Sequence, residues 1–198
     1  MTSTTPRVGI LLFDDVEELD AVGPWEVLAS WAAHSPLRPE VVLLSPDGAP
    51  VRCVKGMRIV PTHGAEDVGP LTVLVHPGGR GARRLMADET HLDWVREMRR
   101  RTPLMASVCT GALVYAAAGL LSGRRATTHW ASLDALVAAD PTIEVDAEAR
   151  FVDEGDVVTS AGVSAGIDMA LHLVARLDSV EAARGVRHGI QYHPAPPV

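Results

Sequence analysis

The sequence predicts an α/β fold in which helices cover both faces of one mainly parallel sheet. Segments of strand length alternate with segments of helix length along the chain, which is the order of parallel strands joined by helical crossovers. Residues 7–13 are almost continuously apolar, the pattern of a strand that is covered on both faces. Residues 104–119 place a strand-length run before a small apolar helical segment, with only a turn between them.

Composition limits the class of protein. The chain has 198 residues, which fit a single domain over 1–198, and 47% of them are hydrophobic, enough for a sizeable core. The two cysteines lack a disulfide-like spacing, so we expect a reducing compartment. No signal peptide is recognised in residues 1–6, and no apolar run reaches membrane-spanning length. We therefore expect a cytoplasmic protein without a membrane partner.

Charge argues against nucleic acid as a partner. The formal net charge is -7, and no basic stripe is concentrated anywhere along the chain. The short arginine clusters at 83–84 and 99–101 are better explained as solvated helix faces.

The N-terminal half of the chain predicts three core strands, at residues 7–13, 40–44 and 71–75. Between the first two, we expect a helix over residues 23–32, because the Gly-Pro pair at its start suits a first helical turn. Residues 45–62 contain two turn signals and predict a hairpin of two short strands. The cysteine of that hairpin, at position 53, is expected to be structural filler.

Capping residues mark two helices in the C-terminal half. Asp88 is expected to cap a helix whose last turns carry arginines, in agreement with the helix dipole. Ser179 is expected to cap a last helix that ends near Ile190, and the tail from Pro194 to Pro197 cannot continue it. A further strand is expected from residue 104 to the turn at 109, and others at 125–128, 143–145, 151–152 and 157–160. Further helices are expected from the turn at 109 to residue 119, from about 129 through 138, and over 167–177.

The turn formed by Cys109, Thr110 and Gly111 is the centre of the functional prediction. A strand that enters a helix through so short a turn has the form of a nucleophile elbow, which holds a reactive side chain in a strained backbone. The helix end would favour a thiolate over a thiol. The alternative is that Cys109 fills the core as a small hydrophobe, a common fate of free cysteines. The turn alone does not decide between them.

Two further groups are expected at the same edge of the sheet. Gly78 follows a core strand, and its backbone N–H is a candidate donor to an oxyanion, although a plain strand-to-helix turn would look the same. Asp20 follows the first strand, where a helix cap or a solvated charge is the alternative. Three candidate groups at one edge of a parallel sheet support a site better than any one of them does.

Six segments together resemble the ThiJ/PfpI superfamily, and they follow the family's order over nearly the whole chain. They are residues 7–13, Leu19-Asp20-x-x-Gly23-Pro24, Pro77-Gly78-Gly79, Ser107-Val108-Cys109-Thr110-Gly111, residues 125–130, and Ala161-Gly162-x-Ser164-Ala165-Gly166-Ile167-Asp168. The resemblance implies a flavodoxin-like three-layer sandwich, usually a homodimer, with no cofactor or metal. Within the superfamily, the motifs are most similar to the isonitrile hydratase group. Those enzymes are hydro-lyases that add water to an isonitrile and release an N-substituted formamide.

The resemblance also implies roles for individual residues. Cys109 corresponds to the nucleophile, Asp20 to the carboxylate near it and Thr110 to the neighbouring active-site residue, while Gly78 and Gly79 fall in the oxyanion turn. Many relatives carry histidine directly after the cysteine, and its replacement by Thr110 counts against peptidase activity. A thiolate and a carboxylate side by side repel each other, so one of the two groups usually holds a proton. We therefore expect Asp20 to share a proton with Cys109 and to deliver it during attack on the isonitrile carbon, with Thr110 orienting water or the nucleophile.

The remaining candidates have weaker patterns. The resemblance places His129 and Trp130 near the substrate, but capping or packing explains His129 equally well. His76 stands where an apolar residue is usual and could alter the pocket. Asp168 is expected as a helix cap or an internal hydrogen-bond acceptor, and His193 as part of the tail. No histidine has the spacing of a metal ligand.

Three other functions remain open. The first is another thiol enzyme of the superfamily that acts on small carbonyls, such as a glyoxalase or deglycase. The second is a ligand-sensing module like that of AraC-type regulators, although we expect no room in the chain for their DNA-binding region. The third is a redox-sensing or chaperone-like stress protein that uses the same cysteine.

Overall fold

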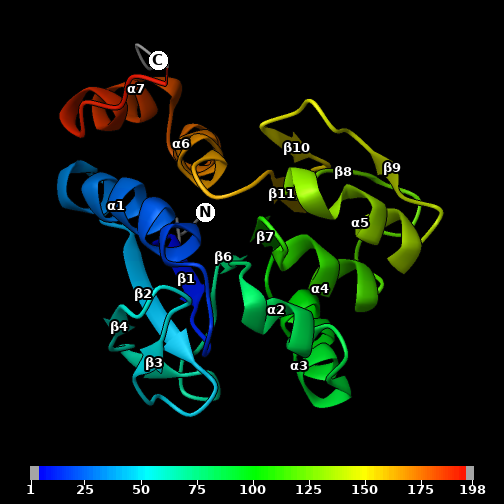
Figure 1. The fold of residues 1–198 in the computed structure, drawn as a ribbon. Helices are drawn as coiled ribbons and strands as arrows, with labels where there is room; N and C mark the ends of the chain where they lie inside the picture. The colour runs from blue at the N-terminus through cyan, green and yellow to red at the C-terminus, as the bar shows by residue number, and fades with distance from the viewer. Residues whose placement is uncertain (1–4, 195–198) are drawn as a thin grey trace.

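The structure is a computed structural model that describes residues 5–194, and Figure 1 shows its fold. Expectations for residues 1–4 and for the tail after Pro194 lie outside the described residues. The strands are β1 (Arg7–Leu11), β2 (Glu40–Ser45), β3 (Val51–Arg52), β4 (Arg58–Ile59), β5 (His63–Gly64), β6 (Val73–His76), β7 (Leu104–Val108), β8 (Arg125–Ala126), β9 (Glu144–Val145), β10 (Phe151–Asp153) and β11 (Val157–Ser160). The helices are α1 (Glu18–His34), α2 (Arg80–Leu85), α3 (Glu89–Arg101), α4 (Gly111–Ala117), the 3-10 helix η1 (Trp130–Ser132), α5 (Leu133–Ala139), α6 (Ala165–Leu177) and α7 (Val180–Gly189).

The central sheet has seven strands in the order β10-β11-β7-β6-β1-β2-β5. All neighbouring strands in it are parallel except β10, which runs antiparallel to β11 at one edge. The residues of β6 and β7 are buried throughout, because helices cover both faces of the sheet. The carboxyl ends of β1, β6, β7 and β11 therefore lie side by side at one edge, where ligands of open parallel sheets usually bind.

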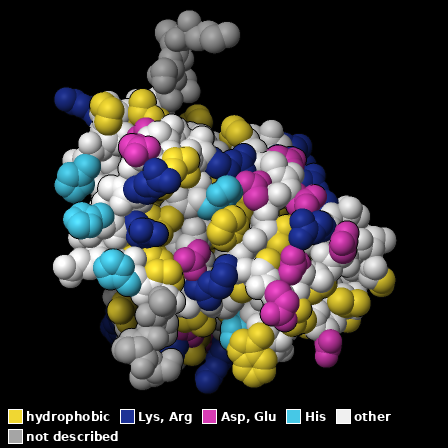
Figure 2. Space-filling model, turned by 90° about the horizontal axis from the view of Figure 1, so that it is seen from above, with side chains coloured by type: hydrophobic (Ala, Val, Ile, Leu, Met, Phe, Trp, Pro, Cys, Tyr) yellow, Lys and Arg dark blue, Asp and Glu magenta, His cyan; other side chains and the backbone are white. Residues whose placement is uncertain are grey.

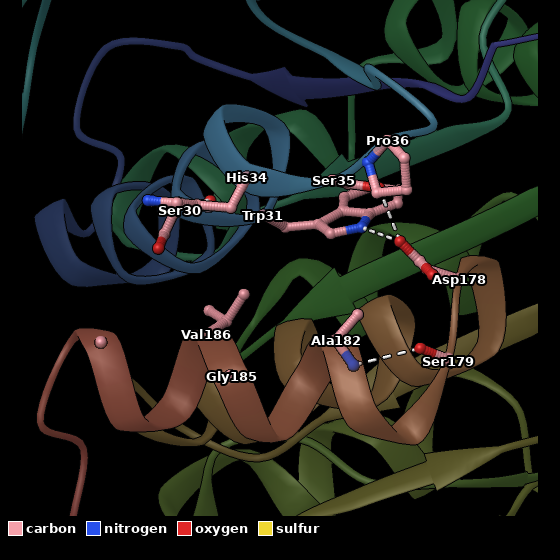
Figure 3. A pocket seen from close by; sticks show the side chains of 11 residues that line it. Ser30, Trp31, His34, Ser35, Pro36, Asp178, Ser179, Ala182, Gly185 and Val186 are labelled. Atoms are coloured by element: carbon pink, nitrogen blue, oxygen red, sulfur yellow. Dashed lines mark hydrogen bonds between the residues drawn. The ribbon is translucent and has the colours of Figure 1, made fainter.

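Helices form one layer on each face of the sheet (Figure 1). On one side α1 packs against α6 and α7, and on the other α2, α3, α4 and α5 pack against one another. The fully buried Trp31 of α1 ties the first layer together, because its indole Nε1 donates to Asp178 Oδ2 at 2.9 Å, and Figure 3 shows this bond at the junction of α6 and α7. The predicted α/β sandwich is confirmed.

Most predicted elements are present. Asp88 accepts from the backbone N–H groups of Thr90 and His91, and Ser179 accepts from Ala182, so both predicted caps are confirmed. β3 and β4 form the predicted hairpin within residues 45–62, with Cys53 buried beside it. The single helix predicted from about 129 through 138 is instead the 3-10 helix η1 followed by α5.

The predicted start of the first helix is wrong. α1 begins at Glu18, so Pro24 lies inside the helix instead of in its first turn. A proline inside a helix leaves the carbonyl of residue i−4, here Asp20, without its usual donor. Acidic residues in the first turn favour the earlier start, because they interact well with the helix N-terminus. Asp20 consequently belongs to the helix and is fully buried.

Two elements were not predicted. β5 has only two residues, and α2 has the sequence RGARRL, which contains a glycine and no apolar repeat. α2 follows directly from Gly79, whose φ of +117° is readily adopted only by glycine. A Cβ at Gly79 would also lie 2.4 Å from the Asp15 carbonyl oxygen and from the Glu17 nitrogen. The turn after β6 is thus held tightly against the start of α1.

On the surface shown in Figure 2, basic and acidic side chains are interspersed, with small groups of hydrophobic side chains between them. Within residues 5–194, no helix is both long and apolar enough to span a membrane.

Candidate active site

The predicted turn after β7 has the expected strained geometry. Cys109 has a φ of +58°, which is uncommon for a residue other than glycine, and it lies between the last residue of β7 and the start of α4. Its backbone N–H donates to the carbonyls of Ser160 and Ala161 at 3.1 and 3.2 Å, which joins the turn to the end of β11. Thr128 Oγ1 donates to the Cys109 carbonyl at 2.7 Å from a buried position. These bonds from neighbouring segments compensate for the strain at Cys109.

Asp20 is the acidic partner that the sequence predicted beside Cys109. Burial raises the pKa of Asp20 to about 7, although the Gly78 N–H, which donates to Asp20 Oδ2 at 3.0 Å, acts in the opposite direction. Its other oxygen, Oδ1, is buried and has no hydrogen-bond partner among the described residues. A buried acceptor without a partner is rare in folded proteins. Asp20 can therefore accept or hold one proton at this atom.

Cys109 is a thiol in this environment at neutral pH. Burial, together with the negative charge of Asp20, raises the pKa of Cys109 to about 12. The backbone N–H groups of Thr110 and Val163 act in the opposite direction, since both interact favourably with a thiolate. The N–H group of Thr110 at the helix end therefore favours a thiolate, as expected, but desolvation outweighs this effect and keeps Cys109 protonated.

Gly78, Gly79 and Thr110 form a single hydrogen-bonded unit. Gly79 N–H donates to Thr110 Oγ1 at 2.9 Å, and that hydroxyl donates in turn to the Gly79 carbonyl at 3.2 Å. A Cβ at Gly78 would lie 2.5 Å from Thr110, so only glycine fits there. The N–H groups of both glycines already have acceptors, so an oxyanion role for Gly78 would require its bond to Asp20 to be exchanged. Thr110 can only accept from a water, because its one proton points to Gly79.

Val163 belongs to the site and was missed in the sequence. It has a φ of +50°, a conformation that a β-branched residue adopts only under strain. Its backbone N–H acts on Cys109 by lowering the pKa of the thiol. The glycine-rich segment after β11 indicated a turn there, but nothing in the sequence showed that a valine would take the left-handed position.

Cys109 and Thr110 lie in a cavity of about 280 Å³ that is open to solvent. The cavity is lined by Glu17, Val54, Gly79, Arg80, Arg83, Cys109, Thr110, His129, Ala131, Ser132 and Val163. Its volume suits a small organic molecule. Of the predicted site residues, Gly79, Cys109, Thr110 and His129 line the cavity, whereas Asp20, Gly78 and Trp130 do not.

His129 and Trp130 differ in their relation to this cavity. His129 lines it, while its Nδ1 accepts from Ala131 N–H at 3.2 Å and so caps η1. The ring lies so close to Gly162 that a Cβ there would be 2.3 Å from His129 Cδ2. Trp130 does not line the cavity, and 78% of its surface is exposed. The structure thus brings His129 to the predicted site and leaves Trp130 outside it.

A larger cavity, of about 420 Å³, lies between α1 and α7 (Figure 3). Its polar centre is Asp178, which accepts from Trp31 Nε1 at 2.9 Å and from Ser35 Oγ at 2.6 Å. No cysteine lines this cavity, and the Cys109–Asp20 pair lies elsewhere. Within residues 5–194, no three His, Cys, Asp or Glu side chains are grouped as a metal site would need. The cavity at Cys109 is therefore the candidate active site.

The chain is similar to several known proteins. Residues 6–176 match the DJ-1/PfpI family. The chain is 42% identical to "Isonitrile hydratase" from Pseudomonas putida over 96% of this chain and 80% of the relative. It is 34% identical to the transcriptional regulator CdhR from Pseudomonas aeruginosa, over 71% of this chain but only 41% of that protein. A ThiJ/PfpI family protein from Pseudomonas syringae has the same fold, with a TM-score of 0.88 and 31% identity over 98% of this chain and 78% of that one.

Proposed function

The chain belongs to the DJ-1/PfpI family, and on that premise we propose that it catalyses the addition of water to an isonitrile, with Cys109 as the nucleophile. The observation that carries this proposal is the interaction between the Cys109 thiol and the buried Asp20 carboxyl group, next to a cavity of small-molecule size. The 42% identity to an isonitrile hydratase supports the choice of substrate class.

The charge states of the pair define the first step. Above pH 7 the pair holds one proton, and that proton is on sulfur, because the pKa of Cys109 is about 12 and that of Asp20 about 7. Asp20 takes this proton through a carboxylate oxygen as the sulfur attacks the terminal carbon of the isonitrile. The same proton then passes to that carbon, which yields a thioimidate bound to Cys109.

Water completes the reaction. It adds to the carbon of the thioimidate, its proton is transferred to nitrogen, and the C–S bond breaks to release the N-substituted formamide and the Cys109 sulfur. The N–H groups of Thr110 and Val163 stabilise the departing thiolate until a proton returns to the pair. No atoms other than those of substrate and water are consumed.

Turnover of simple isonitriles tests the proposal. We expect purified protein to convert alkyl and aryl isonitriles to formamides, with the formyl oxygen coming from ¹⁸O-labelled water. The formamide can be followed by NMR and the label by mass spectrometry. A formamide rate no higher than that of a buffer blank, together with turnover of a small ketoaldehyde, would instead support the glyoxalase-like alternative.

Two arginines suggest which isonitriles fit best. Arg80 and Arg83 line the cavity, and neither has a carboxylate partner among residues 5–194. Arg83 only donates to Ser132 Oγ, at 3.0 Å. Arg84 on the same helix is different, because it pairs with Asp15 at 2.8 Å. The proposal therefore includes a preference for substrates that carry an anionic substituent.

Alkylation of Cys109 measures this preference without an isonitrile. We expect Arg83→Ala to lower the rate with iodoacetate relative to iodoacetamide by about two- to fivefold, the range for exposed charge pairs. The effect should fall at high salt. Arg84→Ala is the matched control and should leave the ratio of rates unchanged. Equal ratios in both variants and the parent would remove the anionic preference.

The proposal also includes a homodimer, which the family resemblance implies, and a cytoplasmic location, which the composition of the sequence suggests. The chain has a mass of 21.1 kDa, so sedimentation equilibrium at micromolar concentration should give about twice that value. A purely monomeric species would contradict the dimer and leave the catalytic proposal in place.

A further inference from the structure

Two buried histidines lie behind the turn that holds Asp20. His76 is the last residue of β6 and is fully buried. Its Nε2 lies 2.9 Å from Nε2 of His91 on α3, and its Nδ1 lies 2.8 Å from the carbonyl oxygen of Pro77. The rings of Phe13 and Tyr115 complete the surroundings of His76, at centroid distances of 5.4 and 5.7 Å.

Only one arrangement of protons satisfies these contacts. The Pro77 carbonyl can only accept a hydrogen bond, so Nδ1 of His76 must carry a proton. A neutral imidazole has one N–H, which makes Nε2 of His76 an acceptor and Nε2 of His91 the donor to it. Both rings are neutral at pH 7, because burial lowers the pKa of His76 to about 3 and that of His91 to about 4. His91 thereby fixes the tautomer of His76.

The chain of hydrogen bonds continues to Asp20 through a single peptide group. The Pro77 carbonyl accepts from His76, and the N–H of the same peptide, at Gly78, donates to Asp20 Oδ2 at 3.0 Å. Accepting a bond at the oxygen polarises an amide and strengthens its N–H as a donor. Every donor in the chain from His91 to Gly78 therefore points toward the carboxylate.

We propose that His76, held in its Nδ1–H tautomer by His91, is a positioning residue that stabilises the ionised form of Asp20 through the Pro77–Gly78 peptide. The inference rests on the proposed function in one respect, namely that Asp20 takes part in catalysis. A residue that merely filled space at position 76 would need no donor toward Pro77.

Among residues 5–194, no charged group acts on His76 to provide another explanation. The ionisable groups that face it are His91 from α3 and Tyr115 from α4, and the Tyr115 hydroxyl donates to the carbonyls of Ala106 and Leu74. Asp88 acts on His91. At the other end, the charges that act on Asp20 are those of Glu17, Lys55 and Cys109.

Two substitutions at His76 separate the donor from the volume of the ring. In His76→Asn, the amide nitrogen takes the place of Nδ1 and can still donate to Pro77. In His76→Gln, the amide reaches the place of Nε2, and the bond to Pro77 is lost. Both are made in a Cys53→Ala background, so that Cys109 is the only thiol that reacts with iodoacetamide.

The readout is the alkylation rate of Cys109 as a function of pH. We expect a midpoint near pH 7 in the parent, where Asp20 titrates. In His76→Gln the midpoint should rise by about half a pH unit, since a weaker Gly78 donor stabilises the carboxylate less. His76→Asn should keep the midpoint of the parent. Equal midpoints in all three proteins, or a parent profile without a midpoint near pH 7, would overturn the proposal.

If the His76 variants do not fold, a pair at His91 decides the question. His91→Gln keeps a donor at the position of Nε2, whereas His91→Phe removes it, and the ring of His76 is untouched in both. We expect a higher midpoint for His91→Phe only, and identical midpoints would overturn the inference. Isonitrile turnover is measured separately, so a shifted midpoint without any turnover would refute the proposed function and leave the role of His76 standing.

Discussion

Cys109→Ala is expected to abolish isonitrile turnover, with a loss of roughly 10⁴-fold or more, as is found when a catalytic nucleophile is removed. The fold should survive, because alanine keeps the Cβ and the strained turn is held by backbone bonds to Ser160 and Ala161. Formamide production and the melting temperature are measured on the same samples. A folded variant with full activity would exclude Cys109 as the nucleophile.

Cys53→Ala is the matched control. Cys53 is as deeply buried as Cys109 but does not line the cavity, and burial and nearby carboxylates raise its pKa to about 11. We expect turnover within a few-fold of the parent, together with a modest loss of stability of about 1 kcal/mol from lost packing. Equal loss of activity in the two cysteine variants would defeat the assignment of Cys109.

Asp20→Asn is expected to lower turnover by about 10² to 10⁴, the usual contribution of a positioned acid or base. Asparagine keeps the size of the side chain and can still accept from Gly78, but it cannot carry the proton of the thiol. In the parent, kcat/KM should rise with pH through about 7, as Asp20 becomes able to accept that proton. This rise should be absent in Asp20→Asn, and Asp20→Glu should retain more activity than the amide.

The thermal stability of the Asp20→Asn variant distinguishes a catalytic role of Asp20 from a structural one. The pKa of Asp20 is raised in the folded protein, from 3.8 to about 7. The folded state therefore binds more protons than the unfolded state between these values, and the contribution of Asp20 to stability falls as the pH rises through this window. At pH 8, Asp20→Asn should accordingly melt no lower than the parent. A variant that is inactive and also unfolded would make Asp20 a structural residue.

Local patterns in the sequence predicted those parts of the fold that depend on nearby residues. Asp88 and Ser179 cap their helices because a side-chain oxygen can satisfy free N–H groups a few residues away. β7 follows from a run of apolar residues, and the tight turn after it follows from Cys109-Thr110-Gly111. Such features need no knowledge of distant segments.

Features that depend on tertiary packing were predicted less well. Pro24 suggested a helix start, but α1 begins a turn and a half earlier and packs against α6 despite the proline. The shifted pKa of Cys109 depends on how deeply the turn is buried and on the nearness of Asp20. The hydrogen bond between His76 and His91 joins β6 to α3, and no pattern in the sequence indicates that these two residues meet. The strain at Val163 is likewise imposed by its neighbours.

The order of the central strands has a consequence for how the protein folds. Asp20, Gly78, Cys109 and Val163 come from four separate crossover units, and only the arrangement β11-β7-β6-β1 brings them together. Contacts between segments so distant in sequence form late and slowly. Until β11 pairs with β7, the Cys109 N–H lacks its acceptors at Ser160 and Ala161, and the strained backbone of the turn lacks these two bonds. The thiol thus passes through folding as an ordinary, accessible cysteine that oxidants can reach. It gains its buried carboxyl partner only when α1, which follows β1, packs beside the turn after β7.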